Sequence, residues 1–562
     1  FFWSVWESRS FSMIRRSAYI STLLFKKTNV SCKAAVSSIS VRAYHSYPDP
    51  NEKPVVKTSV SKYEKSIDKA TLSLALDSKF KVDTLFPGVP VSKGIGATPP
   101  PPTLSTVLDN GLRVASQEMP GLMTSIAILV RTGSAYEDQS DSPDADTGAT
   151  HFLELNAFRS TKNRSYQDFM VELEKIGGMV QCIGQRENII YVMDVMRHDA
   201  EKAFHLLADT IVNPTFPAEE MEEARNIAEL QQTELPSSVF SRELMQRAAY
   251  KQASLSNTHY CPTDILNSVD SKRLTRFREK YFYAGNCTLA VAGLDHELAV
   301  KLANQAFSGV PAKRDSDGKV IVRKSSDDYD KNGSTYTGGM LTETRELKEP
   351  FVKLAMGFEM GGWNDPLLVP ACVMQQILGG GSSFSAGGPG KGMFSRLYTQ
   401  VLNRYYWAES VESFLSIHET KGMMGIDGAC GEQDLVNMIQ IITQQFTALA
   451  SVPVPAEELQ RAKNMLKSSM MMQLESRLVQ CEDIGRQFSV YGFRDSQAEM
   501  CAKIDAVTAE DVMKVAQKMM SHPPSIGVVG HDLSQLPPYE QIATYCRSYY
   551  AQSKVGSGTF TN

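Results

Sequence analysis

Three side chains in the first half of the chain have types and spacing that could support chemistry on a zinc-bound water. His151 and Glu154 are three residues apart in Thr150–Phe158, a segment of helical pattern, so they share one helix face. Glu229 lies on a later helix predicted over 218–234. An imidazole, a carboxylate ligand and a free carboxylate base would suit zinc hydrolysis. Taken alone, a His-x-x-Glu pair is more often a surface helix interaction than a metal site.

Segments with the periodicity of strands and segments with the periodicity of helices must position these residues. Strand patterns cover 112–116, 124–131, 189–196, 287–292 and 525–529, and helical patterns cover 166–176, 200–212, 218–234 and 271–281. The turn Asp109-Asn110-Gly111 before the first strand predicts a hairpin. The strand patterns cluster at the start of this region and again after helical runs. This distribution favours a layered α+β fold over strict βαβ alternation.

An internal duplication organises the chain after residue 102. Pro217–Asn226 pairs with Pro455–Asn464 at an offset of 238 (455 − 217), and Val291–Asp295 pairs with Val528–Asp532 at 237 (528 − 291). Two matches at nearly one offset are rare by chance. We therefore predict two duplicated domains of about 210 residues, each an antiparallel-rich sheet covered by helices. The predicted domains are 103–311 and 333–540, joined by a linker at 312–332 and followed by a C-terminal tail at 541–562.

The N-terminal segment has the composition of an organelle address. Between Met13 and Pro48 there are six basic residues and no acidic ones, with abundant serine. This pattern predicts a mitochondrial transit peptide over residues 1–48, in which residues 1–12 precede the first methionine and are expected to be an artefact or a fragment boundary. Residues 49–102 are predicted to form a polar extension that ends in the proline run 99–102.

Overall composition excludes several classes of protein. The 562 residues are 42% hydrophobic and 22% charged, with a net charge of −5, which is ordinary for a globular protein and argues against a nucleic-acid binder. No apolar run approaches the 18 or so residues of a membrane span. The nine cysteines include no C-x-x-C pair, so a disulfide framework and a thiolate zinc site are both improbable.

The segment Gly148–Leu155 resembles the inverted zinc motif H-x-x-E-H of the pitrilysin-type metallopeptidases. The resemblance implies that His151 and Glu229 match zinc ligands and that Glu154 matches the catalytic base. The second motif histidine is replaced by Leu155, which cannot coordinate zinc. The resemblance therefore implies a vestigial site, with no metal and no cofactor in this chain and no peptidase activity by the chain alone.

A glycine-rich segment lies between helical patterns of the second repeat, and it fails both the Walker and the dinucleotide fingerprints in detail. It resembles the glycine-rich loop of the α-subunits of mitochondrial processing peptidases. That family implies a heterodimer with a zinc-bearing β-subunit, in which the loop captures the presequence for cleavage. The implied substrate-binding residues are Gly379, Gly380, Gly381, Ser382, Ser383, Phe384, Ser385, Ala386, Gly387, Gly388, Pro389, Gly390, Lys391 and Gly392.

The resemblance also sets expectations about partners and location. Presequence peptides are basic, so an acidic wall is expected, and Glu219, Glu220, Glu222 and Glu223 are candidates for it. The alternative interpretation, which we favour, is that these glutamates form an acidic first helical turn that stabilises the helix dipole. The expected location is the mitochondrial matrix, or the matrix side of the inner membrane. The alternatives are a core structural subunit of respiratory complex III, a role compatible with processing, and a stand-alone metallopeptidase with an unusual zinc site.

Overall fold

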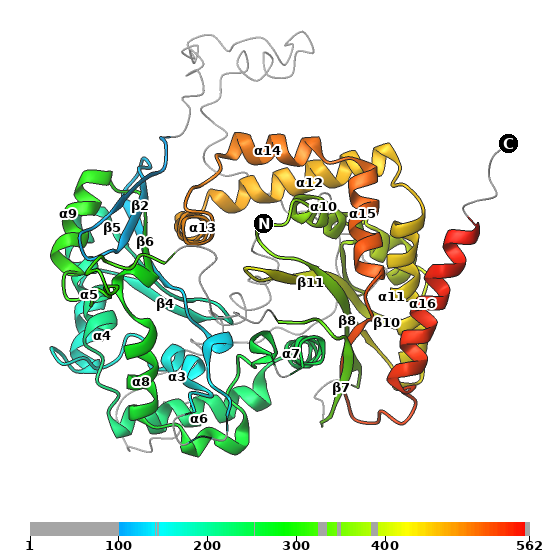
Figure 1. The fold of residues 1–562 in the computed structure, drawn as a ribbon, viewed down its shortest axis with the longest axis horizontal. Coiled ribbons are helices and arrows are strands. Elements are labelled where there is room, and N and C mark those ends of the chain that lie inside the picture. The colour runs from blue at the N-terminus through cyan, green and yellow to red at the C-terminus, as the bar shows by residue number, and fades with distance from the viewer. Residues whose placement is uncertain are drawn as a thin grey trace, which may run out of the picture. The chain divides into compact units, whose positions relative to one another are not determined.

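The computed structural model describes residues 101–140, 142, 145–251, 253–323, 334–345, 350–383 and 392–556. The predicted transit peptide (1–48) and all but the last two residues of the polar extension (49–102) lie outside the described residues. The described chain forms two six-stranded sheets with helices packed against them, as Figure 1 shows.

The first sheet has the strand order β1-β2-β6-β3-β5-β4. Its strands are β1 (Leu104–Val107), β2 (Arg113–Gln117), β3 (Met123–Val130), β4 (Met179–Gly184), β5 (Ile189–Met196) and β6 (Cys287–Ala292). Its part of the chain also contains α3 (Ala149–Leu155), α4 (Tyr166–Lys175), α5 (Ala200–Val212), α6 (Ala218–Glu234), α7 (Ser237–Ala249), α8 (Ser271–Tyr281) and α9 (His296–Ala306). The predicted hairpin is confirmed, since β1 and β2 pair antiparallel across the turn at Gly111.

The second sheet has the order β7-β12-β8-β11-β10-β9. Its strands are β7 (Gly339–Thr344), β8 (Val352–Gly361), β9 (Gly380–Ser382), β10 (Ala408–Ile417), β11 (Lys421–Cys430) and β12 (Ser525–Gly530). The helices of this part are α10 (Leu368–Leu378), α11 (Leu435–Ser451), α12 (Ala456–Leu474), α13 (Arg477–Val490), α14 (Gln497–Ala506), α15 (Ala509–Met520) and α16 (Tyr539–Gly556).

The two sheets repeat one topology. In each, the repeat's closing strand, β6 or β12, lies between a parallel neighbour and an antiparallel one. The order β2-β6-β3-β5-β4 thus corresponds to β7-β12-β8-β11-β10, and each sheet adds one further edge strand, β1 or β9. This arrangement confirms the predicted α+β fold with a duplicated, antiparallel-rich sheet.

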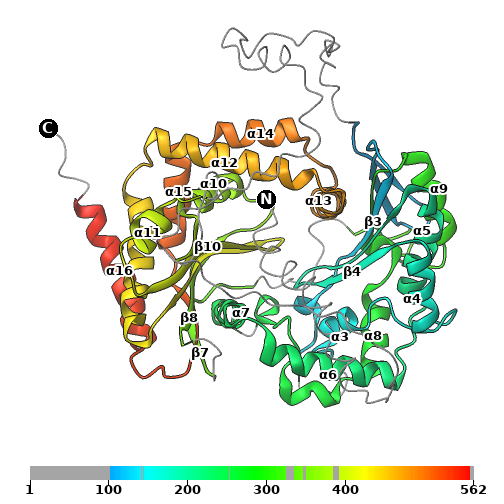
Figure 2. The same ribbon diagram turned by 180° about the vertical axis from the view of Figure 1, so that it is seen from behind.

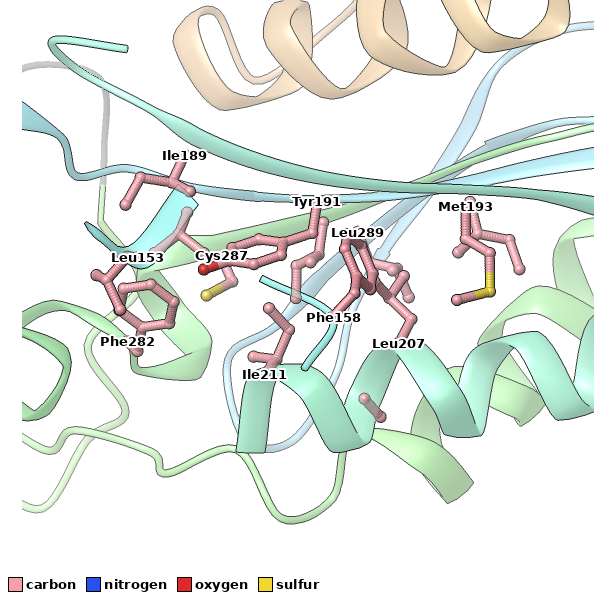
Figure 3. Packing of buried hydrophobic residues seen from close by; sticks show 14 of the residues in the cluster. Leu153, Phe158, Ile189, Tyr191, Met193, Leu207, Ile211, Phe282, Cys287 and Leu289 are labelled. Atoms are coloured by element: carbon pink, nitrogen blue, oxygen red, sulfur yellow. The ribbon is translucent and has the colours of Figure 1, made fainter. Parts of the chain in front are cut away.

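The first sheet is covered on both faces, which explains why its central strands are apolar without alternation. Along β5, Ile189, Tyr191 and Met193 belong to the core on the α5 side. Figure 3 shows Tyr191 and Met193 on the side of the sheet that faces Leu207 and Ile211, and Ile189 beside Leu153. The intervening Ile190 and Val192 pack instead against Ile484 and Phe488 of α13. Because successive side chains of a strand point to opposite faces, both sets are buried only if a layer covers each face.

Each sheet takes the helix that covers one of its faces from the other repeat. Helix α7, from the first repeat, packs on β12, β8 and β7 of the second sheet, and α13, from the second repeat, packs on β6 and β3 of the first. Figures 1 and 2 both show α7 beside β8 and α13 near the strands of the first sheet. Two glycines permit the close approach. A Cβ on Gly527 of β12 would lie 2.0 Å from the carbonyl oxygen of Ser241, and one on Gly485 of α13 would lie 2.2 Å from Leu129.

A buried ion pair also joins the repeats. The guanidinium of Arg131 donates to both carboxylate oxygens of Glu419 at 2.7 and 2.8 Å, and the backbone N–H of Glu419 donates to Glu187. A second buried pair lies within the first repeat, where Arg186 contacts Glu243 of α7 at 2.6 and 3.1 Å and both side chains are about one-tenth exposed. Paired burial of this kind makes each partner costly to remove.

Two connecting segments are more ordered than their composition indicates. In the predicted linker, residues 312–323 lie along the first sheet, where Arg323 donates to the carbonyl of Arg131 and to the Tyr136 hydroxyl. The rest of the linker, 324–332, lies outside the described residues. The predicted C-terminal tail lies largely in α16, because Ile542, Cys546 and Tyr550 recur at helical spacing and are buried.

Among the described residues no single helix could span a membrane, although the bent pair 432–451 and 456–474 has sufficient length and apolar composition together.

Candidate functional site

The vestigial motif lies on α3, whose first turn is held by a buried carboxylate. Glu137 accepts hydrogen bonds from the backbone N–H of Gly148 at 2.9 Å and from that of Thr150 at 2.7 Å. Carboxylate acceptors at a helix N-terminus satisfy donors that the helix leaves unpaired. Burial nevertheless raises the pKa of Glu137 to about 7. Sequence reasoning missed this residue, since it lies far from its partners in an irregular segment.

His151 is enclosed and both of its ring nitrogens are used. Nδ1 accepts from the backbone N–H of Cys261 at 3.2 Å, so Nε2 carries the hydrogen and donates it to Oε1 of Gln231 at 2.7 Å. The side chain is buried, with 1% of its surface exposed. Burial first, and then His259, lower the pKa of His151 to about 4, so the imidazole is neutral at pH 7.

Glu154 faces a second histidine that the sequence analysis did not single out. Nε2 of His259 lies 3.1 Å from Oε2 of Glu154, and both side chains are largely buried. Gly184 on β4 leaves the space for this pair, because a Cβ there would lie 2.8 Å from Oε2 of Glu154 and 2.9 Å from His259. The ring centroids of His151 and His259 are 5.9 Å apart. The structure therefore brings His151 and Glu154 together with His259 and Gln231.

Glu229 does not join this group. It is exposed on α6, whereas Gln231 of the same helix contacts His151. The helical phase was the signal that could have shown this, since the buried positions Ala224 and Ala228 continue to residue 231 and not to 229.

The residues present do not fit a zinc ion. The imidazole of His151 would have to give up a hydrogen bond to coordinate a metal, Leu155 offers no donor atom, and Glu229 points elsewhere. Within the described ranges, no three or more His, Cys, Asp or Glu side chains converge so that they could hold a metal. The arrangement can orient and bury polar groups, but we derive no metal-assisted step from it.

The first stem of the glycine-rich segment is a short edge strand. Gly379 ends α10 with a φ of 57°, and Gly380 and Gly381, with φ of 119° and 159°, enter β9, which pairs with β10. A Cβ on Gly380 would lie 2.1 Å from the carbonyl oxygen of Val411, so only glycine fits there. Ser383 extends the pairing by donating to the carbonyl oxygen of Glu409. Phe384 to Lys391 lie outside the described residues.

The second stem is fixed by side chains. Gly392 has a φ of 73°, and Ser395 accepts a hydrogen bond at Oγ from the backbone N–H of Gly380, which joins the two stems. Arg396 then makes a bidentate contact with Glu458 of α12 at 2.8 and 2.9 Å. Phe394, which lies between Gly392 and Ser395 in the chain, is 74% exposed. Both ends of the glycine-rich segment are thus anchored to the second sheet and its helices.

The predicted acidic wall makes local contacts in the structure. Glu223 pairs with Arg159 at 2.6 Å, Glu222 pairs with Arg225 at 2.5 Å, and Glu220 accepts from the N–H and hydroxyl of Ser160. Glu219 is exposed in the first turn of α6. Of the four, Glu219 and Glu220 lie in the first turn of α6, where an acidic side chain serves the helix dipole. The side chains of Glu222 and Glu223 are 63% and 62% exposed.

Comparison with known proteins agrees with the fold. Residues 113–263 match the family model described as Insulinase (Peptidase family M16), and residues 268–466 match the model described as Peptidase M16 inactive domain. The chain therefore belongs to peptidase family M16.

Several relatives that match over most of its length are named as alpha subunits of mitochondrial-processing peptidases. It is 34% identical over 492 residues to the mitochondrial-processing peptidase subunit alpha of Pongo abelii, covering 83% of this chain and 91% of the relative. It is 32% identical over 490 residues to that of Bos taurus, covering 83% and 90%. It is also 34% identical over 459 residues to that of Solanum tuberosum, covering 80% and 86%.

Proposed function

We propose that this chain is the non-catalytic, substrate-recognition subunit of a mitochondrial processing peptidase heterodimer. Its partner is a β-subunit that carries the zinc ion, and its substrates are the basic presequences of imported precursor proteins. The observation that carries the proposal is the degenerate motif of a family M16 chain, in which Leu155 replaces a ligand and His151 is bonded to Gln231 and Cys261. The names of the relatives support it.

The glycine-rich segment, residues 379–392, is the proposed recognition element. Its stems support this role because they hold the segment at both ends, through β9 on one side and the Arg396–Glu458 pair on the other. Glycine lets the intervening backbone approach a bound peptide closely. The exposed Phe394 beside the second stem offers apolar contact.

The proposed location is the mitochondrial matrix. The acid-free, arginine-containing segment 13–48 supports import, and its removal leaves a more acidic chain because it takes away six positive charges and no negative ones. A more acidic protein attracts basic peptides more strongly. No observation on the described residues favours the core-subunit role in complex III, and we do not propose it.

The test replaces residues 384–391 with alternating serine and threonine, which keeps the length of the segment and both stems. The full chain is co-expressed with a zinc-bearing β-subunit, and binding of a fluorescent presequence peptide is measured. We expect the affinity to fall by about tenfold or more while the heterodimer still assembles. The matched control makes the same replacement in the exposed turn 316–319 and leaves affinity unchanged. Unchanged affinity in the 384–391 variant would overturn the recognition role, and failure to co-purify with any β-subunit would overturn the heterodimer.

A further inference from the structure

The second repeat contains a cavity of about 720 Å³ that the proposed function does not use. It lies between residues 363–370, the C-terminal end of α12, helix α13 and helix α14, and we call it the C-terminal groove. Its volume falls within the roughly 300–1,000 Å³ typical of ligand sites. More than half of its lining residues are apolar. The groove therefore has the size and the lining of a site for an apolar ligand.

The charged side chains of the groove neutralise one another. Five carboxylates line it, and each pairs with a lysine or an arginine at 2.6 to 3.8 Å. The pairs are Asp365–Lys518, Glu482–Arg486, Asp483–Arg494, Asp495–Lys503 and Asp511–Lys514. A charged ligand would have to displace one of these partners, whereas an uncharged ligand leaves every pair intact. The lining therefore favours an uncharged occupant.

Three aromatic side chains also line the groove, those of Trp363, Tyr491 and Phe493. The rings of Tyr491 and Phe493 are 5.8 Å apart and tilted by 34°, and the Tyr491 hydroxyl donates to the carbonyl oxygen of Trp363 at 2.9 Å. Phe493 is 55% exposed, so its ring is accessible to a ligand. Grooves lined by aromatic side chains bind P-x-x-P segments in the polyproline II conformation, because such segments are extended before they bind and lose little entropy.

The first residues that the structure describes lie beside this groove. The carbonyl oxygen of Pro101 accepts a hydrogen bond from Nε2 of Gln117 at 2.6 Å, and the hydroxyl of Thr103 accepts one from Nη1 of Arg494 at 3.1 Å. Arg494 lines the groove and also donates to Gln117. The sequence that precedes Pro101 is therefore tethered at the margin of the groove.

That preceding sequence carries the pattern that the groove favours. Residues 85–91 (LFPGVPV) contain no charged side chain, and Pro87 and Pro90 form a P-x-x-P pattern. Ten residues, 91–100, separate Pro90 from Pro101, and in polyproline conformation they can span about 30 Å at about 3.1 Å per residue. Because Phe493 is the chain neighbour of Arg494, this reach is sufficient.

We propose that residues 85–91 dock in the C-terminal groove of the same chain, with Pro87 and Pro90 against the three aromatic side chains. The inference goes beyond the proposed function and does not depend on it, because the groove contains no residue of the glycine-rich segment or of the vestigial motif. It gives the predicted polar extension a role, since the docked segment would close the groove to other ligands.

The first test places the photoreactive residue benzoylphenylalanine at position 86 of the full chain. We expect crosslinks to residues 363–370 or 470–511 of the same chain, mapped by mass spectrometry after gel separation of the monomer. Crosslinks confined to other parts of the chain would overturn the proposal. Crosslinked dimers with no crosslinked monomer would assign the groove to a second copy and would also overturn it.

The second test measures whether the groove is already occupied. A fluorescent peptide of residues 84–92 is titrated against the full chain and against the double variant Pro87→Ser with Pro90→Ser, and anisotropy reports the affinity. We expect the double variant to bind the peptide at least about tenfold more tightly, because a tethered segment competes at an effective concentration of about millimolar in the parent. The matched control, Pro50→Ser with Pro54→Ser, removes two prolines of the same extension outside the pattern and should bind as the parent does. Equal affinity of the three chains, or binding by none of them, would overturn the docked segment.

A third variant tests the place where the peptide binds. Phe493→Ala, added to the Pro87→Ser, Pro90→Ser chain, removes an accessible ring of the groove and should weaken peptide binding by about tenfold or more. Tyr406→Ala in the same background is the matched control, because this aromatic side chain is 99% exposed and lies outside the lining, and it should change the affinity less than about twofold. Equal affinity of the Phe493→Ala and Tyr406→Ala chains would place the peptide elsewhere and contradict the proposal.

Discussion

Nε2 of His151 and Oε1 of Gln231 lie 2.7 Å apart, so a hydrogen bond occupies the position where a histidine of the H-x-x-E-H motif would hold its metal. The bond joins α3 to α6 in a buried setting, and the Cys261 backbone completes the ring's hydrogen bonding on the other side. A neutral histidine with both nitrogens satisfied stabilises the packing of three segments. At this position of the motif, the histidine serves as a structural contact.

Rebuilding the ligand set should restore zinc binding. Leu155 is four residues from His151 on α3 and so lies on the same face, and Gln231 faces that histidine from α6. The double substitution Leu155→His with Gln231→Glu supplies two imidazoles and a carboxylate. We expect about one zinc per chain by atomic emission after dialysis. Leu155→His alone, which keeps the Gln231 hydrogen bond, serves as the control and should bind little. A double variant as free of zinc as the parent would show that the backbone no longer permits the geometry.

The contact between β12 and α7 should not tolerate a methyl group. In Gly527→Ala the new Cβ would meet two backbone atoms of α7, at Ser241 and Met245, which cannot move aside as a side chain can. We expect a loss of about 3 kcal/mol in the free energy of unfolding, measured by urea denaturation. Gly309→Ala is the control, because its nearest neighbour is a methyl group of Val212 at 3.2 Å, and it should change stability by less than about 1 kcal/mol. Equal stability of the two variants would contradict the close approach.

A buried histidine should make the chain less stable in acid. Burial first, and then the charge of Arg186, lower the pKa of His418 to about 3, below its ordinary value of 6.5. As the pH falls below 6.5, His418 takes up a proton in the unfolded chain but stays neutral in the folded chain. Its contribution to stability is therefore fully present above pH 6.5 and is lost as the pH falls toward 3. Between pH 6.5 and 5, protonation of His418 in the unfolded chain should lower the free energy of unfolding by about 2 kcal/mol.

The variant His418→Gln isolates this contribution. Glutamine keeps an acceptor for the amide of Gln246, which lies 3.0 Å from Nε2 of His418, but it does not titrate. The free energy of unfolding, measured by urea denaturation, should fall between pH 6.5 and 5 by about 2 kcal/mol less in the variant than in the parent. The exposed His198 is the control position, and His198→Gln should leave the pH dependence as it is. A variant that keeps the full acid sensitivity would assign that sensitivity to other groups.

Strong periodicity allowed much of the fold to be predicted. Helices α5, α6 and α8 and strands β5 and β6 coincide with their predicted ranges because each carries an uninterrupted pattern. Helix α7 escaped prediction. Its buried face includes Ser241, Glu243 and Gln246, and its partner is the sheet of the other repeat. No local pattern reports a partner about 100 or more residues away. The same limit applies to the site, where His259 and Glu137 reach α3 only through tertiary contacts.

The exchange of α7 and α13 also sets the order in which the protein can be completed. The last strand of the first sheet, β6, ends at Ala292, but the helix that covers one face of that sheet ends only at Val490. At about 5–20 residues per second, roughly 200 further residues take about 10–40 s to synthesise. During that interval Leu129, Ile190 and Val192 have no cover from α13. Until α13 is available, this face of the first sheet is exposed apolar surface, of the kind that aggregates or binds chaperones.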